Sequence, residues 1–361
     1  MAQIELQEIA HSYMPNPRND ADYALKRIHE TWEDGGAYAL LGPSGCGKTT
    51  LLNIISGLLK PSHGRVLYDG REVTSLPPEK RNIAQVFQFP VLYDTMSVFN
   101  NLAFPLKNRG IPRTEITQRV HEVAEILDLT PFLKNKAAGM TADAKQKISL
   151  GRGLVRKDVA AILFDEPLTV IDPQLKWHLR RKLKEIHDQL RLTLIYVTHD
   201  QVEALTFAEK VMVMYEGELV QAGTPQELFE NPNHKFVGYF IGSPGMNFIP
   251  CTVEGNIARF NGAGIRLDDR TAALAAKAKG SLELGIRPIH LKVHKQSVED
   301  GLAAQIRSVE DQGSHKIVSL MLDKHLLYAR LAEEEPVPED QAWVVFPPQW
   351  TRLYADERLL K

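Results

Sequence analysis

Cysteines and long apolar runs are scarce in this sequence. Only two cysteines occur among the 361 residues, Cys46 and Cys251, and they lie far apart in no metal-like spacing. This scarcity is typical of a reducing cytosol, although it leaves a single disulfide open. No apolar run approaches the ~18 residues that span a bilayer. The first residues, MAQIELQEIAHSY, include acidic side chains and no long apolar stretch, so we expect no secretory signal. Any contact with a membrane should therefore be made through a partner.

The chain also lacks an excess of positive charge. Its formal net charge is -2, with 43 Lys and Arg against 45 Asp and Glu. Broad nucleic-acid binding favours a basic surface, so we expect no nucleic-acid partner. There is no internal repeat and no low-complexity segment. A 43% hydrophobic and 24% charged chain of this length is typical of two folded domains with a substantial core.

Short apolar runs alternate with helical patterns in the first two thirds of the chain. The runs YALLG, AAILF and TLIYVTH each end in a turn, and this alternation favours a mainly parallel sheet flanked by helices. Apolar residues at helical spacing predict a helix over residues 116–127. A second helix should follow Asp172 as N-cap and Pro173 as first helical residue. VLYDGREV predicts a hairpin that turns at Asp69–Gly70.

The pattern changes near residue 240. SPGMNFIP is a turn-rich bridge, and the runs KIVSLML and AWVVF that follow have the character of strands. Helical periodicity is weak beyond this point, apart from TAALAAKAKG. We therefore expect a first domain at residues 1–240 and an all-β domain at residues 241–361.

Residues 42–50 read GPSGCGKTT and match the pattern G-x-x-x-x-G-K-[ST]. Glycines let the chain wrap closely around a triphosphate, and a helix N-terminus adds partial positive charge. A strand-like run precedes the motif and a helix-like run follows it, which makes a chance match a poor explanation. We expect Lys48 to reach the β- and γ-phosphates of a bound triphosphate and the Thr49 hydroxyl to hold Mg²⁺. The other predicted nucleotide-binding residues are Gly42, Ser44, Gly45, Cys46, Gly47 and Thr50, with Cys46 as a small packing residue rather than a reactive thiol.

A second motif, AAILFDEP, reads as a buried strand that delivers two carboxylates to the ligand-binding edge of the sheet. Asp165 would hold Mg²⁺ through water, because this cation prefers oxygen ligands. Glu166 would polarise the attacking water as a general base. The sequence DEP by itself is commonly a turn after a strand, so the prediction depends on its pairing with the phosphate loop.

The run YVTHD repeats this architecture and ends a third apolar strand with His199. A lone histidine is usually structural. At the same edge of the sheet as Glu166, however, an imidazole could donate to the γ-phosphate. We therefore predict a catalytic role for His199.

With these motifs in this order and spacing, the chain resembles the ATP-hydrolysing subunits of ABC transporters, in particular importer ATPases for sugars, polyols and glycerol phosphate. The resemblance runs along nearly the whole chain. It implies an ABC-type α/β P-loop domain, with a mixed sheet and a helical subdomain, at residues 1–240. GSPGMNF and LGIRPIHL resemble parts of the family's C-terminal regulatory domain, which implies an OB-like all-β fold for residues 241–361.

Three further roles follow from the resemblance alone. VFQFPVLYDTMSVFNNLAFPL is similar to the family's Q-loop region, which implies that Gln88 contacts Mg²⁺ and the attacking water and that the next residues meet the permease. DEPLTVID is similar to the acidic motif with its D-loop, which implies that Asp172 lies on the dimer face. Tyr13 falls at the position where the family stacks an aromatic ring on adenine, which implies the same role here. The alternative is that Tyr13 is a half-buried residue of a strand.

One segment departs from the family's pattern. Residues 140–144 stand where the family has LSGGQ, which in a head-to-tail dimer closes over the ATP held by the neighbouring phosphate loop. Here they read MTADA. Thr141 keeps a hydroxyl in place of the serine, so we expect it to contact nucleotide, whereas Ala142 and Asp143 replace both glycines.

These replacements should weaken the clasp. A Cβ would stand where backbone must touch phosphate, and Asp143 would face a triphosphate. The alternative is that Asp143 turns outward and caps the following helix. A homodimer would have two impaired sites, so we hypothesise a heterodimer with a second ATPase subunit that carries an intact LSGGQ. That partner would complete the site built on Lys48 and Glu166.

The resemblance thus predicts an ATPase subunit, with ATP and Mg²⁺ as cofactors, that powers import of a small carbohydrate or polyol such as glycerol or glycerol phosphate. It would bind permease subunits peripherally at the cytoplasmic face of the inner membrane and, through them, serve a periplasmic or extracellular solute-binding protein. One alternative is a soluble nucleotide-gated ABC regulator that is not coupled to transport. Another, an ABC-type ATPase of DNA repair or translation, predicts long insertions or a second cassette, and the sequence has neither.

Overall fold

A six-stranded sheet with the order β10-β9-β3-β8-β7-β6 forms the centre of the first part of the chain. The computed structural model describes residues 2–169 and 171–361. The strands of this sheet are β3 (Ala37–Leu41), β6 (Ala84–Val86), β7 (Ile162–Asp165), β8 (Leu194–Thr198), β9 (Lys210–Tyr215) and β10 (Glu218–Gly223). All adjacent pairs are parallel except β9 with β10. The prediction of a mainly parallel sheet is therefore confirmed, and β3 and β8 are buried at every position because both faces are covered.

A second, antiparallel sheet packs on the same core. Its order is β2-β1-β4-β5, and its strands are β1 (Ile4–His11), β2 (Leu25–Trp32), β4 (His63–Tyr68) and β5 (Arg71–Glu72). Strands β4 and β5 form the predicted hairpin, in which Tyr68 pairs with Arg71. Its two turn residues, Asp69 and Gly70, have φ values of 49° and 74°. Both lie in the left-handed region, as a two-residue hairpin turn requires.

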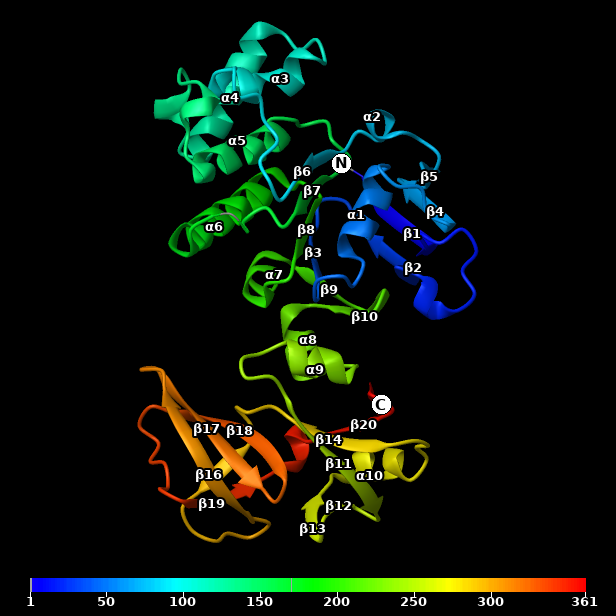
Figure 1. The fold of residues 1–361 in the computed structure, drawn as a ribbon, viewed down its shortest axis with the longest axis vertical. Coiled ribbons are helices and arrows are strands. Elements are labelled where there is room, and N and C mark those ends of the chain that lie inside the picture. Colours follow the sequence, from blue (N-terminus) through cyan, green and yellow to red (C-terminus); the bar gives the residue numbers. More distant parts are fainter. Residues whose placement is uncertain (1, 170) are drawn as a thin grey trace. The chain divides into compact units, whose positions relative to one another are not determined.

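The helices that the structure describes in the first unit are labelled in Figure 1. They are α1 (Lys48–Ser56), α2 (Pro78–Arg81), α3 (Val98–Lys107), α4 (Arg113–Ile126), α5 (Ala142–Leu154), α6 (Pro173–Leu190) and α7 (Gln201–Phe207). The short 3-10 turns are η1 (Asp20–Asp22), η2 (Thr130–Phe132) and η3 (Ala137–Gly139). Both predicted helices are present, as α4 and α6. The Asp172 carboxylate caps α6 by accepting from the Gln174 N–H at 2.9 Å.

Helices α3, α4 and α5 gather into one helical subdomain (Figure 1). Gly151 on α5 allows the close approach of its neighbours, because a Cβ at this position would meet the Leu102 side chain at 2.5 Å. The buried Arg119 of α4 donates to the carbonyls of Leu154 and Val155 at 2.8 and 3.1 Å. It thereby satisfies carbonyls that the end of α5 leaves without a helical partner. The subdomain expected from the resemblance is therefore present.

The second unit is built from two antiparallel sheets around one core. One has the order β13-β12-β11-β14-β20-β21, and the other β15-β19-β16-β17-β18. The strands are β11 (Asn247–Glu254), β12 (Ile257–Phe260), β13 (Ala263–Arg266), β14 (Leu282–Ile286), β15 (Lys292–His294), β16 (Leu302–Asp311), β17 (His315–Leu322), β18 (His325–Ala332), β19 (Gln341–Val345), β20 (Arg352–Ala355) and β21 (Arg358–Leu359). The helical elements are α8 (Pro225–Glu230), α9 (Lys235–Phe240), α10 (Asp269–Ala275) and η4 (Pro348–Trp350). The prediction of a C-terminal all-β fold is confirmed.

The chain divides into compact units between Pro225 and Gln226. Nearly all of α8 and the whole of α9 therefore belong to the second unit, although they precede the boundary that we expect at residue 240. The reason is Arg287, which is only 3% exposed. Its guanidinium donates to the carbonyls of Phe229 and Gly238, both at 2.9 Å, and to that of Ile241. The domain boundary that we expect at residue 240 therefore stays a prediction.

Within the described residues, no helix combines the length and the apolarity that a membrane crossing requires. Cys46 and Cys251 are both free, so the disulfide that composition leaves open is not formed.

Replacing Arg287 by Leu should destabilise the second unit. Buried carbonyls, including that of Leu228 at 3.4 Å, would lose their donor, and each unsatisfied group costs ~1–3 kcal/mol. We expect the unfolding midpoint of this unit to fall by about 10 °C, measured by calorimetry. The control is Arg266→Gln, which removes an exposed ion pair to Asp300 at 3.4 Å and should shift the midpoint only slightly. Equal shifts in the two variants would contradict the assignment.

Candidate functional site

The turn between β3 and α1 is a closely wrapped loop. Gly47, the N-cap of α1, has φ 100°, and a Cβ there would meet the Ala24 carbonyl oxygen at 2.6 Å. At Gly42 a Cβ would meet the Met214 carbonyl oxygen at 2.3 Å. Both glycines are therefore required by the neighbouring backbone as well as by any ligand. On the outer side of the loop, the exposed residues are Ser44, Gly45 and Thr49.

Lys48 lies inside this loop and is only 5% exposed. Its ammonium group donates to the carbonyls of Gly42 at 2.8 Å and Pro43 at 2.9 Å. These two acceptors hold a buried positive charge at the centre of the loop, next to the N-terminus of α1, so the loop is suited to an anion. Cys46 is 3% exposed, and burial raises the pKa of its thiol. A neutral, buried thiol fits a packing role in the loop.

Side-chain oxygen atoms of Thr49 and Asp165 lie close together beside the phosphate loop. The Thr49 hydroxyl donates to the Asp165 carboxylate at the end of β7, at 3.4 Å. Burial, and then the charge of the adjacent Glu166, raises the pKa of Asp165. A divalent cation at this point would relieve the excess negative charge, so the donor set fits Mg²⁺. The described residues contain no cluster of three His, Cys, Asp or Glu side chains that could hold a metal, so phosphate oxygens and water would have to complete the shell.

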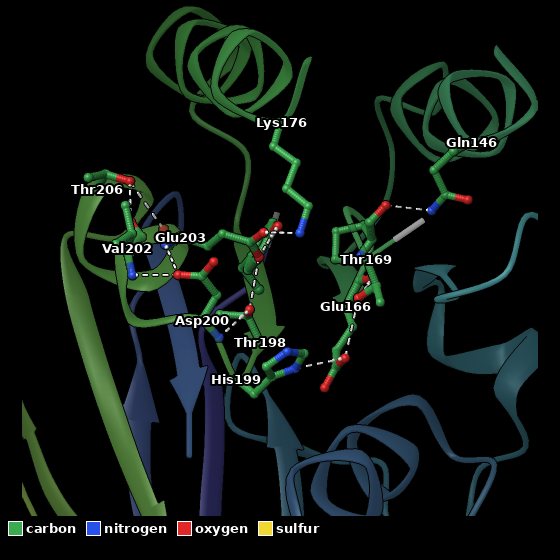
Figure 2. Close-up of polar contacts among 12 residues, drawn as sticks. Gln146, Glu166, Thr169, Lys176, Thr198, His199, Asp200, Val202, Glu203 and Thr206 are labelled. Atoms are coloured by element: carbon green, nitrogen blue, oxygen red, sulfur yellow. Dashed lines mark hydrogen bonds and ion pairs between the residues drawn. The ribbon is translucent and has the colours of Figure 1, made fainter. Parts of the chain in front are cut away.

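Glu166 and His199 converge from neighbouring parallel strands, β7 and β8 (Figure 2). His199 Nδ1 lies 3.1 Å from Glu166 Oε2. Glu166 has φ 47°, in a region that non-glycine residues rarely adopt, and its N–H donates to the Val197 carbonyl at 2.9 Å. Thr169 donates to the Glu166 carbonyl oxygen at 3.1 Å and lies 3.3 Å from its carboxylate. A carboxylate that can accept a proton thus stands beside an imidazole that can donate one.

Tyr13 follows β1 rather than lying within it, and its side chain is 66% exposed. Its hydroxyl lies 3.1 Å from Thr50 Oγ1, and its ring meets His11 edge-on at 4.6 Å between centroids. The alternative of a half-buried strand tyrosine is therefore wrong. An exposed aromatic face tied to α1 is available for stacking, while the contact with adenine stays a prediction.

Gln146 was not identified from the sequence, although it connects two of the motifs. It is fully buried on α5, and its amide donates to the carbonyls of Pro167 at 2.7 Å and Phe87 at 3.3 Å. Pro167 follows Glu166, and Phe87 precedes the half-buried Gln88. The helical subdomain is thereby attached to both loops. No local sequence signal marks such a contact, because its partners are main-chain atoms far away in the chain.

The unusual segment MTADA forms the start of α5. Thr141 is the N-cap, and its side chain accepts from the Ala144 N–H at 3.3 Å. Asp143 lies in the first turn, 3.7 Å from the Lys147 ammonium. The idea that Asp143 provides the cap is therefore wrong, because the threonine already occupies that position. Thr141 and Ala142 are exposed, on a different element from the phosphate loop.

Asp172 is exposed, and its carboxylate caps the first turn of α6 by accepting from the Gln174 N–H. The structure thus brings Lys48, Thr49, Asp165, Glu166 and His199 to the carboxyl edge of one sheet, whereas Thr141 and Asp172 lie at the N-termini of two separate helices.

Three families match the chain. The ABC transporter family matches residues 25–169, the MalK OB fold domain matches residues 242–291, and the TOBE domain matches residues 284–353. Over 303 residues the chain is 40% identical to the sn-glycerol-3-phosphate import ATP-binding protein UgpC of Bordetella pertussis. The aligned region covers 84% of this chain and 82% of that protein. The chain is 37% identical to the protein of the same name from Yersinia enterocolitica, over 100% of this chain and 99% of that protein.

A solved structure gives the same assignment. The cbiO1 protein from Clostridium perfringens, part of the ABC transporter complex cbiONQ, is 28% identical with a TM-score of 0.57, over 63% of this chain and 90% of that one. The phosphate loop, the paired carboxylates and the two relatives that cover more than four fifths of the chain agree, so the chain belongs to the ABC transporter family of ATP-binding proteins.

Proposed function

We propose that this chain is the ATP-hydrolysing subunit of an importer for a small carbohydrate or polyol, with glycerol and glycerol phosphate as the leading solutes. The observation that carries the proposal is the 3.1 Å approach of His199 to Glu166, beside a phosphate loop that already holds Lys48. The names of the relatives, which are sn-glycerol-3-phosphate import proteins, support the choice of solute. Solute selection itself would lie with the permease and a periplasmic or extracellular solute-binding protein.

Each predicted site residue has its own role in ATP hydrolysis. Lys48 exchanges its loop carbonyls for β- and γ-phosphate oxygens and neutralises their charge. Glu166 accepts a proton from the attacking water, and His199 donates to the γ-phosphate. Tyr13 stacks on adenine, and Gln88 helps to orient the water. Mg²⁺, held by Thr49, Asp165 and Gln88, would supply further neutralisation of the phosphate charge.

Replacing Glu166 by Gln should lower kcat for ATP hydrolysis by about 100-fold or more, because a general base contributes roughly 10²–10⁴-fold. ATP binding should persist, since Lys48 and its loop are unchanged. Phosphate release and equilibrium nucleotide binding, measured on the chain co-purified with its transporter partners, test this. Glu185→Gln, an exposed position on α6, is the matched control.

Two outcomes of this experiment would point elsewhere. Wild-type protein that binds ATP without turnover would favour the nucleotide-gated regulator. Full activity in Glu166→Gln would remove Glu166 from the reaction.

The second proposal concerns the partner ATPase. Ala142 and Asp143 occupy the first turn of α5, where a clasp on a neighbour's ATP needs bare backbone. At ~5 Å and an effective dielectric of ~20, a carboxylate beside each unit of phosphate charge costs about 3 kcal/mol before screening. Lys147, at 3.7 Å from Asp143, offsets part of this. We infer that this chain pairs with a different ATPase subunit that has an intact signature.

Turnover should therefore depend on the partner. We expect the chain alone to hydrolyse ATP slowly, and the double substitution Ala142→Gly and Asp143→Gly to raise its homodimeric rate by roughly 10-fold, the kinetic equivalent of ~1.4 kcal/mol. Glu125→Gln removes a charge from an exposed position of α4 and should change nothing. Rapid turnover by the chain alone that the two glycines leave unaltered would exclude the heterodimer.

The permease contact is proposed for the segment after Gln88. Phe89, Val91 and Tyr93 are 69%, 54% and 41% exposed, an unusual run of exposed apolar side chains. Beside them lies a groove of about 210 Å³ whose lining includes Phe87, Val91 and Arg152. A partner helix could bury this apolar surface there and hold the chain peripherally at the cytoplasmic face of the membrane.

Replacing both Phe89 and Val91 by Ala should weaken assembly with the permease, because apolar area contributes ~25 cal/mol per Å². We expect co-purified permease to fall at least 5-fold while nucleotide binding by the chain is preserved. Leu58→Ala, at a residue that is 54% exposed elsewhere on the first unit, is the control. Undiminished assembly of the double variant would place the contact on another surface.

A further inference from the structure

A buried carboxylate behind His199 joins three elements of the first unit. Glu203, on α7, is only 4% exposed. Its Oε2 accepts from the Thr198 hydroxyl at 2.8 Å and from the Tyr196 hydroxyl at 3.1 Å, both on β8. Its Oε1 lies 3.4 Å from the Lys176 ammonium on α6 (Figure 2). Burial, and then the charge of Glu203, keeps the pKa of Tyr196 well above its usual range, so this hydroxyl stays a donor.

The contact with Thr198 fixes the backbone on both sides of His199. The Thr198 hydroxyl donates to Glu203 and also accepts from the Asp200 N–H at 3.0 Å. The Asp200 carboxylate in turn caps α7 by accepting from the N–H groups of Val202 and Glu203, at 2.7 and 3.2 Å. His199 therefore stands between two residues that are each bound to the start of α7.

The imidazole itself has little packing to orient it. The His199 side chain is 53% exposed, against 19% for Glu166. An exposed side chain keeps a single direction only when its backbone is held and a partner accepts from it. For His199, Thr198 and Asp200 hold the backbone, and the Glu166 carboxylate is the acceptor for the imidazole.

Lys176 extends the connection to α6. Its side chain is 27% exposed and supplies positive charge close to Glu203, which reduces the cost of burying a carboxylate. Its backbone N–H donates to the Asp172 carbonyl at 3.0 Å, within the first turn of α6. The position of Glu203 is thus linked to Asp172 and the first turn of α6.

We propose that Glu203 is a positioning residue for His199. Through Thr198 it sets the direction in which the imidazole meets Glu166 and the γ-phosphate, and through Lys176 it makes that direction depend on the start of α6. The proposal rests on the proposed function, because it needs His199 to act in ATP hydrolysis.

A purely structural role for Glu203 gives a different expectation. A buried carboxylate that only stabilises the fold would, when changed, lower activity by the same factor whether His199 is present or absent. A positioning residue acts through His199, so its loss should matter little once the imidazole is gone. Residues that act as a unit are non-additive in this way.

The test is a double-mutant cycle between Glu203→Gln and His199→Ala. It uses the chain co-purified with its transporter partners, with single-turnover assays to measure low rates. We expect Glu203→Gln to lower kcat at least 10-fold with KM for ATP within 2-fold of wild type, and to lower the rate less than 2-fold in the His199→Ala background. Glu185→Gln on α6 is the matched control. Calorimetry of each variant reports whether the fold is kept.

Thr198 gives a second measurement in case Glu203→Gln fails to fold. Thr198→Val removes the hydroxyl at nearly constant volume and should lower kcat at least 5-fold, whereas Thr198→Ser keeps the hydroxyl and should stay within 2-fold of wild type. Equal factors for Glu203→Gln in both His199 backgrounds would overturn the proposal, as would full activity in both Glu203→Gln and Thr198→Val. A wild-type protein without ATPase activity, or an unimpaired His199→Ala variant, would instead contradict the proposed function.

Discussion

The structure depends on the enclosure of one positive charge by a turn of backbone. Lys48 is nearly inaccessible, and its charge is held by two carbonyls of the loop that it closes. This arrangement is possible only because Gly42 and Gly47 let the chain pass within van der Waals distance of Met214 and Ala24. The rest of the first unit supplies the strand before this loop, the helix after it, and the neighbouring strands that carry acidic groups toward it.

Parallel strands explain how the other groups reach the same place. β7 and β8 are adjacent and run in the same direction, so the residues that follow them, Glu166 and His199, emerge at one edge. The left-handed backbone at Glu166 turns its side chain at once after the strand. Main-chain bonds and the Thr169 hydroxyl hold this strained position. A carboxylate and an imidazole from distant parts of the sequence thereby form one pair.

Two buried polar side chains then tie this edge to the surrounding helices. Gln146 attaches α5 to the loops around Phe87 and Pro167, and Glu203 attaches α7 and α6 to β8. Buried polar groups are costly unless they are hydrogen-bonded, so each fixes a definite arrangement of its neighbours. Through these contacts the start of α5 is attached to the loop after Glu166, and α6 and α7 are attached to the strand that precedes His199.

The sequence by itself determined the features whose partners lie close in the chain. The phosphate loop, the strands that lead to Asp165 and His199, the Asp172 cap and the Asp69–Gly70 hairpin all follow from a few adjacent residues, because glycine, proline and capping side chains act over one turn. The matched family and the C-terminal all-β fold also followed from motif order and strand-like runs. The tertiary structure alone decided that Thr141 rather than Asp143 caps α5, and that Arg287 draws α8 and α9 into the second unit. It also decided that Gln146, Thr169 and Glu203 surround the candidate site. These contacts join main-chain or buried polar atoms that packing brings together, and a buried polar residue looks the same in a sequence whatever partner the fold gives it.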